Sequence, residues 1–511
     1  MLLSAEMKKN LLISAIYSKI ICSNQLFVVP LQRFLKAEVM TEPMFGRDEE
    51  CRLIKKYLSS NRSEFVAVYG RRRVGKTFLL RQTLDDSLCF SFTGMANSKN
   101  SEQLLNFFVT LRRYYPKAKA CTNWLEAFDQ LQDYVENCTQ EQKVIFIDEL
   151  PWLDTPKSNF MPAFEHFWNG WASGRSDIKL FVCGSATSWM LDNIINNHGG
   201  LHNRITHEMF LEPFTLGLCK QYFDAYHFGY SDRELAEFYM IFGGVPYYLS
   251  LMDKEQSVTQ NVDRLIFSAK GELRDEKENL FRSLFRHSED YVAIIDAISE
   301  KRKGLTRAEI LEETKLDNNA LFTKRLEELE KCNFIRHYED YSNRQRNTLY
   351  QLVDPLCHFW HNIVEQSKHR DEQFWSHSQN SPLFNAWSGL AFEMLCLNHV
   401  PQIKQALGIS GIQADIYSWR TPADVTPGAQ IDLVIDRADR CVNICEMKFS
   451  RSEYEMDDAE RNKIENRILQ FQRYAEPRKS IRLTMVTSYG VKRNTHSSIV
   501  QNEITLADLM R

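Results

Sequence analysis

The strongest constraint on the fold is an eight-residue phosphate-loop motif, GRRRVGKT, at residues 70–77. It matches the pattern G-x-x-x-x-G-K-[ST] at every position. The apolar run Phe65–Tyr69 comes directly before it and is typical of a buried parallel strand. An amphipathic, helix-patterned stretch follows it. Strand, loop and helix in this order predict an α/β domain built on a parallel sheet.

The motif also predicts nucleotide binding, because each of its residue types has a task there. Gly70 and Gly75 let backbone N–H groups turn inward around phosphate oxygens, and the following helix adds partial positive charge. Lys76 is expected to reach the β- and γ-phosphates, and the Thr77 hydroxyl is expected to be a ligand of Mg²⁺. Arg73, in the same loop, is also expected to bind the nucleotide. The alternative is an ordinary glycine turn.

A second apolar strand, at residues 143–148, ends in the acidic pair Asp148-Glu149. The carboxyl ends of strands in an open α/β sheet form the edge where ligands bind. Asp148 is therefore expected to hold Mg²⁺, and Glu149 is expected to polarise the attacking water. The alternative is a strand end whose two acids are simply solvated.

Three positions further along the chain are candidates for the same site. Ser185 follows the next apolar strand and is expected beside the γ-phosphate as a sensor, or else serves as a helix N-cap. Arg204 is a candidate arginine finger or γ-phosphate sensor, with a structural salt bridge as the alternative. Pro246 lies in a Gly-Gly-x-Pro turn that could bring backbone to the nucleotide, or be plain turn chemistry.

Together these motifs resemble the archaeal ATPase family, a branch of the AAA+/STAND P-loop group. The resemblance covers residues 41–260 and rests on FGRDEE, GRRRVGKT, IDELPWL, CGSATSWM, the arginine before LEPF, and GGVPYYL. It implies that ATP is bound with Mg²⁺ and that its hydrolysis acts as a conformational switch. The family often has Gly-Arg where this chain has Asn203-Arg204, a departure that bears on the role of the arginine.

Residues 285–353 read as three short helices and a hairpin, which resembles a winged helix-turn-helix. A helix that enters the major groove should be basic. Residues 291–350 contain 11 Lys/Arg and 11 Asp/Glu, so their charges cancel. Arg344 and Arg346, at the wing tip, are the best phosphate contacts. The sequence leaves open whether this module binds DNA or serves as an inter-domain or protein-binding module.

A second group of chemically active residues lies near the C-terminus. Asp432 is near the start of one strand, and Glu446 and Lys448 are in the next. Glu446 and Lys448 are two residues apart and so share a strand face, and a hairpin would bring Asp432 beside them. Two carboxylates and a lysine can hold Mg²⁺ or Mn²⁺ and activate a water. Glu393, on an upstream helix, is a candidate third acid.

This arrangement resembles the PD-(D/E)XK nuclease fold over residues 384–490, with helix, strands, helix and strand carrying D…E-x-K. Gln470 and Tyr474 match the Q-x-x-x-Y spacing of its RecB-like branch. The region also resembles a domain of unknown function that is often fused to archaeal-type ATPases. The resemblance implies metal-dependent nuclease action on DNA. The alternative is a degenerate domain in which Asp432 and Lys448 form an ion pair and the chain is an ATP-dependent switch that cuts nothing.

Composition limits the remaining choices. The net charge of −4 excludes a whole-protein polycation, and the 12 cysteines include no C-x-x-C pair, which favours reduced thiols in the cytoplasm. Polar residues interrupt the apolar stretch 11–30, so no membrane segment is expected. The expected partners are ATP and DNA, a second protein or further copies of the chain. The expected α/β organisation is an N-terminal extension or non-native start (1–39), a P-loop ATPase core (40–215), a helical lid and connector (216–284), a winged helix-turn-helix (285–353), an aromatic linker (354–383) and a restriction-endonuclease-like domain (384–511).

Overall fold

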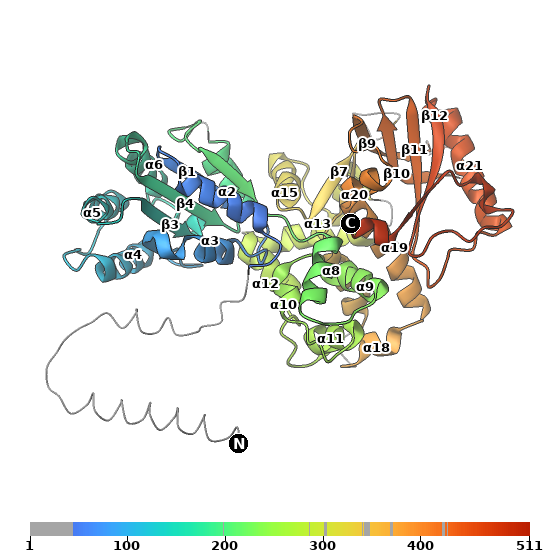
Figure 1. Ribbon diagram of the computed structural model, residues 1–511, viewed down its shortest axis with the longest axis horizontal. Coiled ribbons are helices and arrows are strands. Elements are labelled where there is room, and N and C mark those ends of the chain that lie inside the picture. The colour runs from blue at the N-terminus through green and yellow to red at the C-terminus, as the bar shows by residue number, and fades with distance from the viewer. Residues whose placement is uncertain are drawn as a thin grey trace, which may run out of the picture. The chain divides into compact units, whose positions relative to one another are not determined.

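The computed structural model divides into two units, Met1–Phe45 and Gly46–Arg511. It describes residues 44–197, 199–285, 287–300, 304–339, 341, 348–367, 371–421, 425–426 and 428–511 (Figure 1). The predicted N-terminal extension and the wing-tip residues Arg344 and Arg346 lie outside the described residues. No helix in these ranges is long and apolar enough to cross a bilayer.

The predicted parallel sheet is present. It has five strands in the order β2-β3-β4-β1-β5, and every neighbouring pair is parallel. The strands are β1 (Glu64–Tyr69), β2 (Leu88–Thr93), β3 (Lys143–Asp148), β4 (Ile178–Gly184) and β5 (His207–Phe210). Because all strands point the same way, the phosphate loop after β1 and the acids after β3 emerge at one edge of the sheet.

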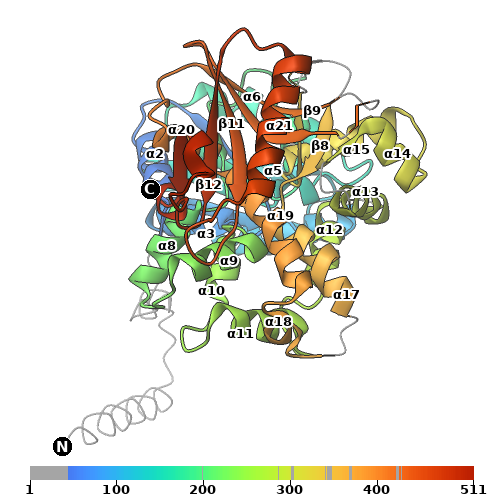
Figure 2. The same cartoon turned by 90° about the vertical axis from the view of Figure 1, so that its right-hand side faces the viewer.

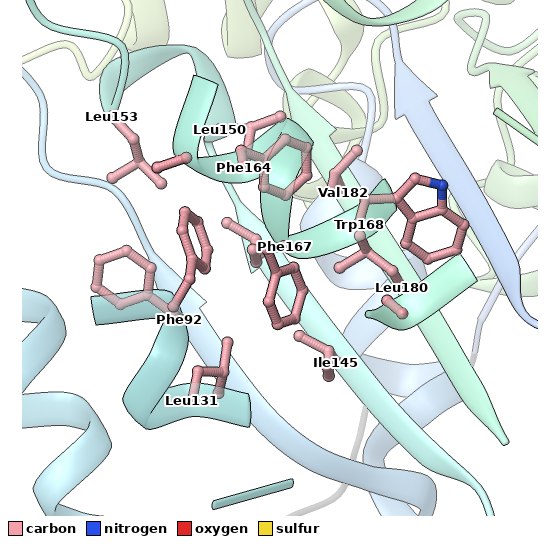
Figure 3. Close-up of a cluster of buried hydrophobic side chains, with 14 of the residues drawn as sticks. Phe92, Leu131, Ile145, Leu150, Leu153, Phe164, Phe167, Trp168, Leu180 and Val182 are labelled. Carbon is pink, nitrogen blue, oxygen red and sulfur yellow. The ribbon is translucent and has the colours of Figure 1, made fainter. Parts of the chain in front are cut away.

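Helices cover this sheet, which explains why its strands read as continuous apolar runs. The helices of this domain include α2 (Asp48–Leu58), α3 (Lys76–Leu84), α4 (Asn100–Tyr114), α5 (Trp124–Glu136), α6 (Phe160–Gly170) and α7 (Thr187–Met190). Side chains of α5 and α6 pack on alternate residues of the strands. Figure 3 shows Leu131, Phe164 and Phe167 against Ile145 of β3 and Leu180 of β4. All of these side chains are buried.

A helical region follows, as the sequence predicts. It contains α8 (Leu216–Ala225), α9 (Asp232–Phe242), α10 (Pro246–Ser250), α11 (Val258–Val262), η6 (Asp263–Phe267) and α12 (Glu276–Leu284). The winged-helix elements come next: α13 (Ser288–Glu300), β6 (Leu305–Thr306), α14 (Arg307–Thr314), α15 (Ala320–Lys331), β7 (Ile335–Tyr338) and β8 (Leu349–Leu352). The three strands form an antiparallel sheet in the order β6-β8-β7. Thr306 caps α14 through a capping box.

Residues 354–383, predicted as an aromatic linker, contain short helices with buried aromatic side chains. The helices are α16 (Pro355–Phe359), η7 (Trp360–Val364), α17 (Glu365–Ser367) and α18 (Phe374–Ser378). Trp375 is fully buried, and its ring centroid lies 4.9 Å from that of Phe359 and 5.0 Å from that of Trp387. Edge-to-face contacts at these distances are favourable. The aromatic composition here reflects packing.

The last domain contains a second, mixed sheet in the order β13-β12-β11-β10-β9. Its elements are α19 (Pro382–Asn398), β9 (Ala414–Arg420), β10 (Gln430–Arg437), β11 (Cys441–Lys448), α21 (Asp458–Ala475), β12 (Ser480–Thr487) and β13 (Asn502–Thr505). The strands β9, β10 and β11 are antiparallel, whereas β12 runs parallel to β11. Phe471 of α21 packs against Trp419 and Ile444, and Figure 2 shows α21 lying along the sheet.

Candidate functional site

The phosphate loop has the backbone that its glycines predict. Gly70 has φ +141°, and a Cβ there would lie 2.5 Å from the carbonyl oxygen of Leu211. Gly75 has φ +92° and directly precedes α3. Side chains are strained at such angles, so both positions require glycine. Arg73 also has a positive φ angle, +71°, in the middle of the loop. The loop therefore turns at the start of a helix, where an anion is favoured.

Lys76 lies inside this turn. Its side chain is 4% exposed, and Nζ donates to the carbonyl oxygens of Gly70 and Arg71, each at 2.9 Å. Burial lowers the pKa of Lys76, while Cys183, Glu149 and Asp148 act in the opposite direction. An ammonium group has three donors, so one remains for a phosphate oxygen. The position fits the predicted contact with the β- and γ-phosphates.

The two predicted metal-binding groups of the ATPase domain meet directly. The Thr77 hydroxyl donates to Asp148 Oδ1 at 3.0 Å, and the Cys183 thiol donates to the same oxygen at 2.7 Å. Asp148 is buried at the carboxyl end of β3. A hydroxyl and a carboxylate at this spacing are hard oxygen ligands, the kind that Mg²⁺ takes in phosphoryl-transfer sites.

Glu149 and Ser185 are also brought together. The Ser185 hydroxyl donates to Glu149 Oε1 at 2.8 Å, and the Ser185 backbone N–H donates to Oε2 at 3.1 Å. Glu149 has φ +51°, so the chain turns sharply straight after Asp148. This turn directs the carboxylate toward the end of β4. The serine proposed as a γ-phosphate sensor thus orients the glutamate proposed to polarise water.

Two predicted residues remain, Pro246 and Arg204, and only Pro246 has a described contact that places it beside the phosphate loop. Pro246 is the first residue of α10, and the backbone N–H of Tyr247 donates to the carbonyl of Arg73 at 3.4 Å, so the turn lies against the phosphate loop. Arg204 is exposed, and among the described residues its guanidinium forms no ion pair or hydrogen bond. Its role as an arginine finger or sensor stays a prediction.

Arg47 is a functional residue that sequence reasoning missed. Its buried guanidinium donates to the carbonyl oxygens of Glu212 at 2.7 Å and Val74 at 3.3 Å, and it pairs with Glu50 at 3.1 Å. Burial lowers the pKa of Arg47, opposed by Glu50. Val74 belongs to the phosphate loop, so the hydrogen bond from Arg47 holds the backbone of the loop in place. Arg47 is part of the FGRDEE motif, but no local sequence pattern indicates that it would contact Val74, 27 residues further along the chain.

Two loop arginines connect the nucleotide site to later parts of the chain. Arg71 forms a buried ion pair with Asp354, which also accepts a hydrogen bond at 2.7 Å from the N–H of Cys357 and so caps α16. Arg73 pairs with Glu276 of α12 at 2.7 Å and lies 4.2 Å from the centre of the Tyr247 ring. The loop therefore contacts both the helical region and the segment that follows the winged helix.

The C-terminal candidate residues form a charged group centred on Glu446. Lys448 Nζ lies 2.9 Å from Glu446 and 2.7 Å from Glu460, and Arg467 forms a second ion pair with Glu446. Burial alone would raise the pKa of Glu446, but Lys448 and Arg467 hold it below its ordinary value. Glu460 and Arg467 were not predicted. They are seven residues apart on α21 and therefore share one helix face, which is the signal that could have found them.

Asp432 and Glu393 belong to the same region. Leu433 pairs with Cys445 in the antiparallel register, so Asp432 and Glu446 lie on adjacent strands just beyond the last paired residues. Glu393 and Asp432 line one small cavity. Burial raises the pKa of Glu393 to about 8, and Asp432 and Glu446 add to the rise. Within the described residues, the oxygens of these three acids do not all lie within 4.8 Å of one another.

The Q-x-x-x-Y pair of α21 lies on the same helix. Tyr474 is 36% exposed, and the Arg473 guanidinium lies 5.5 Å from the centre of its ring. Gln470 is half-buried. The resemblance of this pair to the RecB-like branch rests on its Q-x-x-x-Y spacing.

A third acidic group, Asp296, His361 and Glu365, has ligand atoms within 4.8 Å of one another. Lys277 Nζ, however, lies 2.6 Å from Asp296 and 2.8 Å from Glu365. An ammonium group in this position neutralises the carboxylates that a metal would need. The group is therefore an ion-pair network that joins α12, α13 and η7.

This network predicts a pH-dependent stability. The carboxylates of Asp296 and Glu365, 3.6 and 3.4 Å from His361 Nδ1, raise the pKa of His361 from 6.5 to about 9, against the effect of burial. Lys277 faces the same two carboxylates. A raised pKa stabilises the fold fully below 6.5, and this contribution is lost as the pH rises to 9. Melting temperatures measured across this window should fall more steeply in the wild type than in His361→Gln. The exposed His166→Gln variant should retain the wild-type slope, and an equal slope in His361→Gln would contradict the assignment.

Comparison with known proteins identifies the first half of the described chain. Residues 44–252 match the model of a family described as an ATPase domain predominantly from Archaea. An uncharacterised protein of Methanocaldococcus jannaschii is 26% identical over 258 residues, which are 50% of this chain and 53% of that protein. The chain thus spans about half the length of this curated relative.

Solved structures give weaker similarities. The Walker-type ATPase of Pyrococcus abyssi is 21% identical, with 63% of this chain and 96% of that chain covered and a TM-score of 0.45. The ORC2 protein of Aeropyrum pernix, in ADPNP and ADP complexes, is 13% identical, with 66% and 99% covered and a TM-score of 0.39. Neither score reaches 0.5, so the assignment rests on the family model and the geometry of the loop. Residues 44–252 form a P-loop ATPase domain of the family found predominantly in Archaea.

Proposed function

We propose that this protein is a DNA-processing ATPase in which the P-loop domain is coupled to a metal-dependent nuclease-like domain. The observation that carries the proposal is the proximity of three acids: Glu393 and Asp432 line one cavity, and Asp432 and Glu446 both raise the pKa of Glu393. Glu393 comes from α19, Asp432 from β10, and Glu446 with Lys448 from β11. The element order α19, three antiparallel strands, α21 and a parallel strand agrees with the PD-(D/E)XK resemblance.

The donor sets of both sites suit Mg²⁺. Thr77 and Asp148 would hold the ion that accompanies ATP, and Asp432, Glu446 and Glu393 offer only carboxylate oxygens for Mg²⁺ or Mn²⁺. When bound, such an ion supplies Lewis-acid stabilisation of phosphate charge. Glu149 would orient the water at the ATP γ-phosphate. Lys448 would orient the water at the DNA phosphate as an ammonium group, because its pairing with Glu446 and Glu460 raises its pKa.

A second candidate function is an ATP-dependent switch that binds DNA or protein and cuts nothing. The observation that favours it is the double pairing of Glu446 with Lys448 and Arg467. Two cations already balance this carboxylate without a metal ion. The nuclease proposal therefore requires that Asp432 supply additional negative charge and that the metal ion displace the proton from Glu393, whose pKa is raised to about 8.

Cleavage assays distinguish these two functions. Single-stranded, duplex and branched DNA should be tested with Mg²⁺ or Mn²⁺, with and without ATP. Glu446→Ala is expected to lose at least about a hundredfold in cleavage rate, because a metal ligand is removed. Lys448→Ala should still bind metal by calorimetry yet lose cleavage. Asp432→Asn should weaken both.

The matched control for these variants is Glu453→Ala. Glu453 is exposed, lies just beyond β11 and has no described side-chain partner. The Glu453→Ala variant should cut DNA at the wild-type rate. If the wild type cuts none of the three substrates with either metal, the switch function replaces the nuclease proposal.

A further inference from the structure

A large cleft lies beside the phosphate loop, and the proposed function does not use it. Its volume is about 1330 Å³. One wall comes from the ATPase domain, including Arg72 of the phosphate loop, Lys99 before α4, and Trp152 and Lys157 after β3. The other wall comes from α12 and from α15 of the winged helix, including Leu321 and Lys324. The cleft is therefore bounded by residues from six separate segments of the chain, including the one that contains Trp189.

The lining of this cleft is strongly basic although the chain as a whole carries a net charge of −4. Seven lysines and arginines line it, against two carboxylates, Asp154 and Glu328. Three of the cations, Arg72, Lys99 and Lys157, form no ion pair with any described carboxylate. Asp154 is itself engaged, since it accepts a hydrogen bond from the Trp189 indole at 3.1 Å. The cleft therefore has a net positive charge that suits a polyanion.

Aromatic side chains lie between these cations. Trp152 and Trp189 are half-buried and both line the cleft, and the apolar Leu321 is 52% exposed there. The indole nitrogen of Trp189 is held by Asp154, which fixes the orientation of the ring. Cations that follow a phosphate backbone, together with fixed aromatic rings, are the combination with which proteins bind single strands. An acidic peptide would use the cations but would have no use for ring platforms.

The position of α15 favours a single strand over an ordinary duplex contact. In a winged helix-turn-helix this helix would enter a major groove. Here its exposed residues Leu321 and Lys324 face the cleft. Its C-terminal end is tied to the ATPase domain, with Lys331 2.7 Å from Asp192 and Cys332 Sγ 3.8 Å from the Ser188 hydroxyl. A helix face that forms one wall of a cleft is less accessible to a rigid double helix than to a flexible unpaired strand.

We propose that this cleft binds single-stranded nucleic acid, with phosphates on Arg72, Lys99 and Lys157 and bases stacked on Trp152 and Trp189. The inference deepens the proposed action on DNA by naming the form of the substrate and where it lies. Because Arg72 belongs to the phosphate loop, the strand site and the nucleotide site share one wall. Strand binding is therefore expected to change with the bound nucleotide.

Fluorescence anisotropy of a labelled oligo(dT) strand, with the full chain in EDTA, tests this proposal. Lys99→Glu/Lys157→Glu should bind at least about tenfold more weakly and show a shallower dependence of affinity on salt. Trp152→Ala should bind about tenfold more weakly, because one stacking platform is removed. The exposed double variant Lys117→Glu/Lys119→Glu, which makes the same charge change outside the cleft, should bind like the wild type. Melting temperatures establish that each variant is folded.

Three results would overturn the proposal: unchanged oligo(dT) affinity in Lys99→Glu/Lys157→Glu, tighter binding of the matching duplex than of the single strand, or displacement of the strand by poly-glutamate as effectively as by unlabelled oligo(dT). EDTA removes the divalent ions that cleavage needs, so the readout is independent of the C-terminal site. Cleavage without binding in the cleft would contradict only this inference. Binding in the cleft without cleavage would contradict only the nuclease proposal.

Discussion

ATP hydrolysis by Lys76→Ala is expected to fall at least about a hundredfold below the wild type. Lys76 is buried within the phosphate loop, where its Nζ is fixed by the carbonyls of Gly70 and Arg71. Alanine removes the positive charge placed for the β- and γ-phosphates and leaves two loop carbonyls without their donor. Nucleotide binding should weaken as well. Phosphate release under saturating ATP and calorimetry with a nucleotide measure the two effects.

Glu149→Gln should separate binding from chemistry. Glutamine keeps the size of the side chain and can still accept the hydrogen bond from the Ser185 hydroxyl. It cannot act as a base, so hydrolysis should fall at least about a hundredfold while nucleotide affinity stays near the wild type. The exposed Glu141→Gln variant, outside the site, is the matched control. Near wild-type turnover in either Lys76→Ala or Glu149→Gln would contradict the assignment of the site.

The parts that sequence predicted well are those in which neighbouring residues determine the geometry. The phosphate loop is a local pattern, and Gly70 and Gly75 adopt the positive φ angles that the motif requires. The apolar run ending at Asp148 predicted a buried parallel strand, since both faces of such a strand are covered. The two-residue period of strands likewise placed Glu446 and Lys448 on one face, where they now lie 2.9 Å apart.

The parts that sequence missed are contacts between distant positions. Arg71 and Asp354 are 283 residues apart, and Arg47 reaches Glu212 across 165. No spacing rule connects such pairs, because their proximity is a product of how the helical regions pack. The apparent charge balance of the winged helix was similarly uninformative. Its basic residues Lys324 and Arg325 face a cleft completed by the ATPase domain, which the local sequence cannot reveal.

The missed contact between Arg71 and Asp354 joins two functional parts of the chain. Arg71 lies in the phosphate loop, and its guanidinium is 5.4 Å from the centre of the Phe334 ring, which precedes β7. Asp354 follows β8 and caps α16. The ion pair therefore connects the phosphate loop to the segment between the winged helix and the C-terminal domain.

Asp354→Ala is expected to destabilise the fold by about 3–5 kcal/mol, because it leaves Arg71 buried with an uncompensated charge and removes the cap of α16. The midpoint of urea unfolding, followed by circular dichroism, measures the loss. The double variant Arg71→Met/Asp354→Leu should recover part of it, since apolar side chains of similar size remove both charges together. Glu49→Ala, which breaks the exposed pair of Glu49 with Arg52, is the control and should leave the midpoint nearly unchanged. If Asp354→Ala shifts the midpoint no more than Glu49→Ala does, the buried pair does not hold the phosphate loop to the rest of the chain.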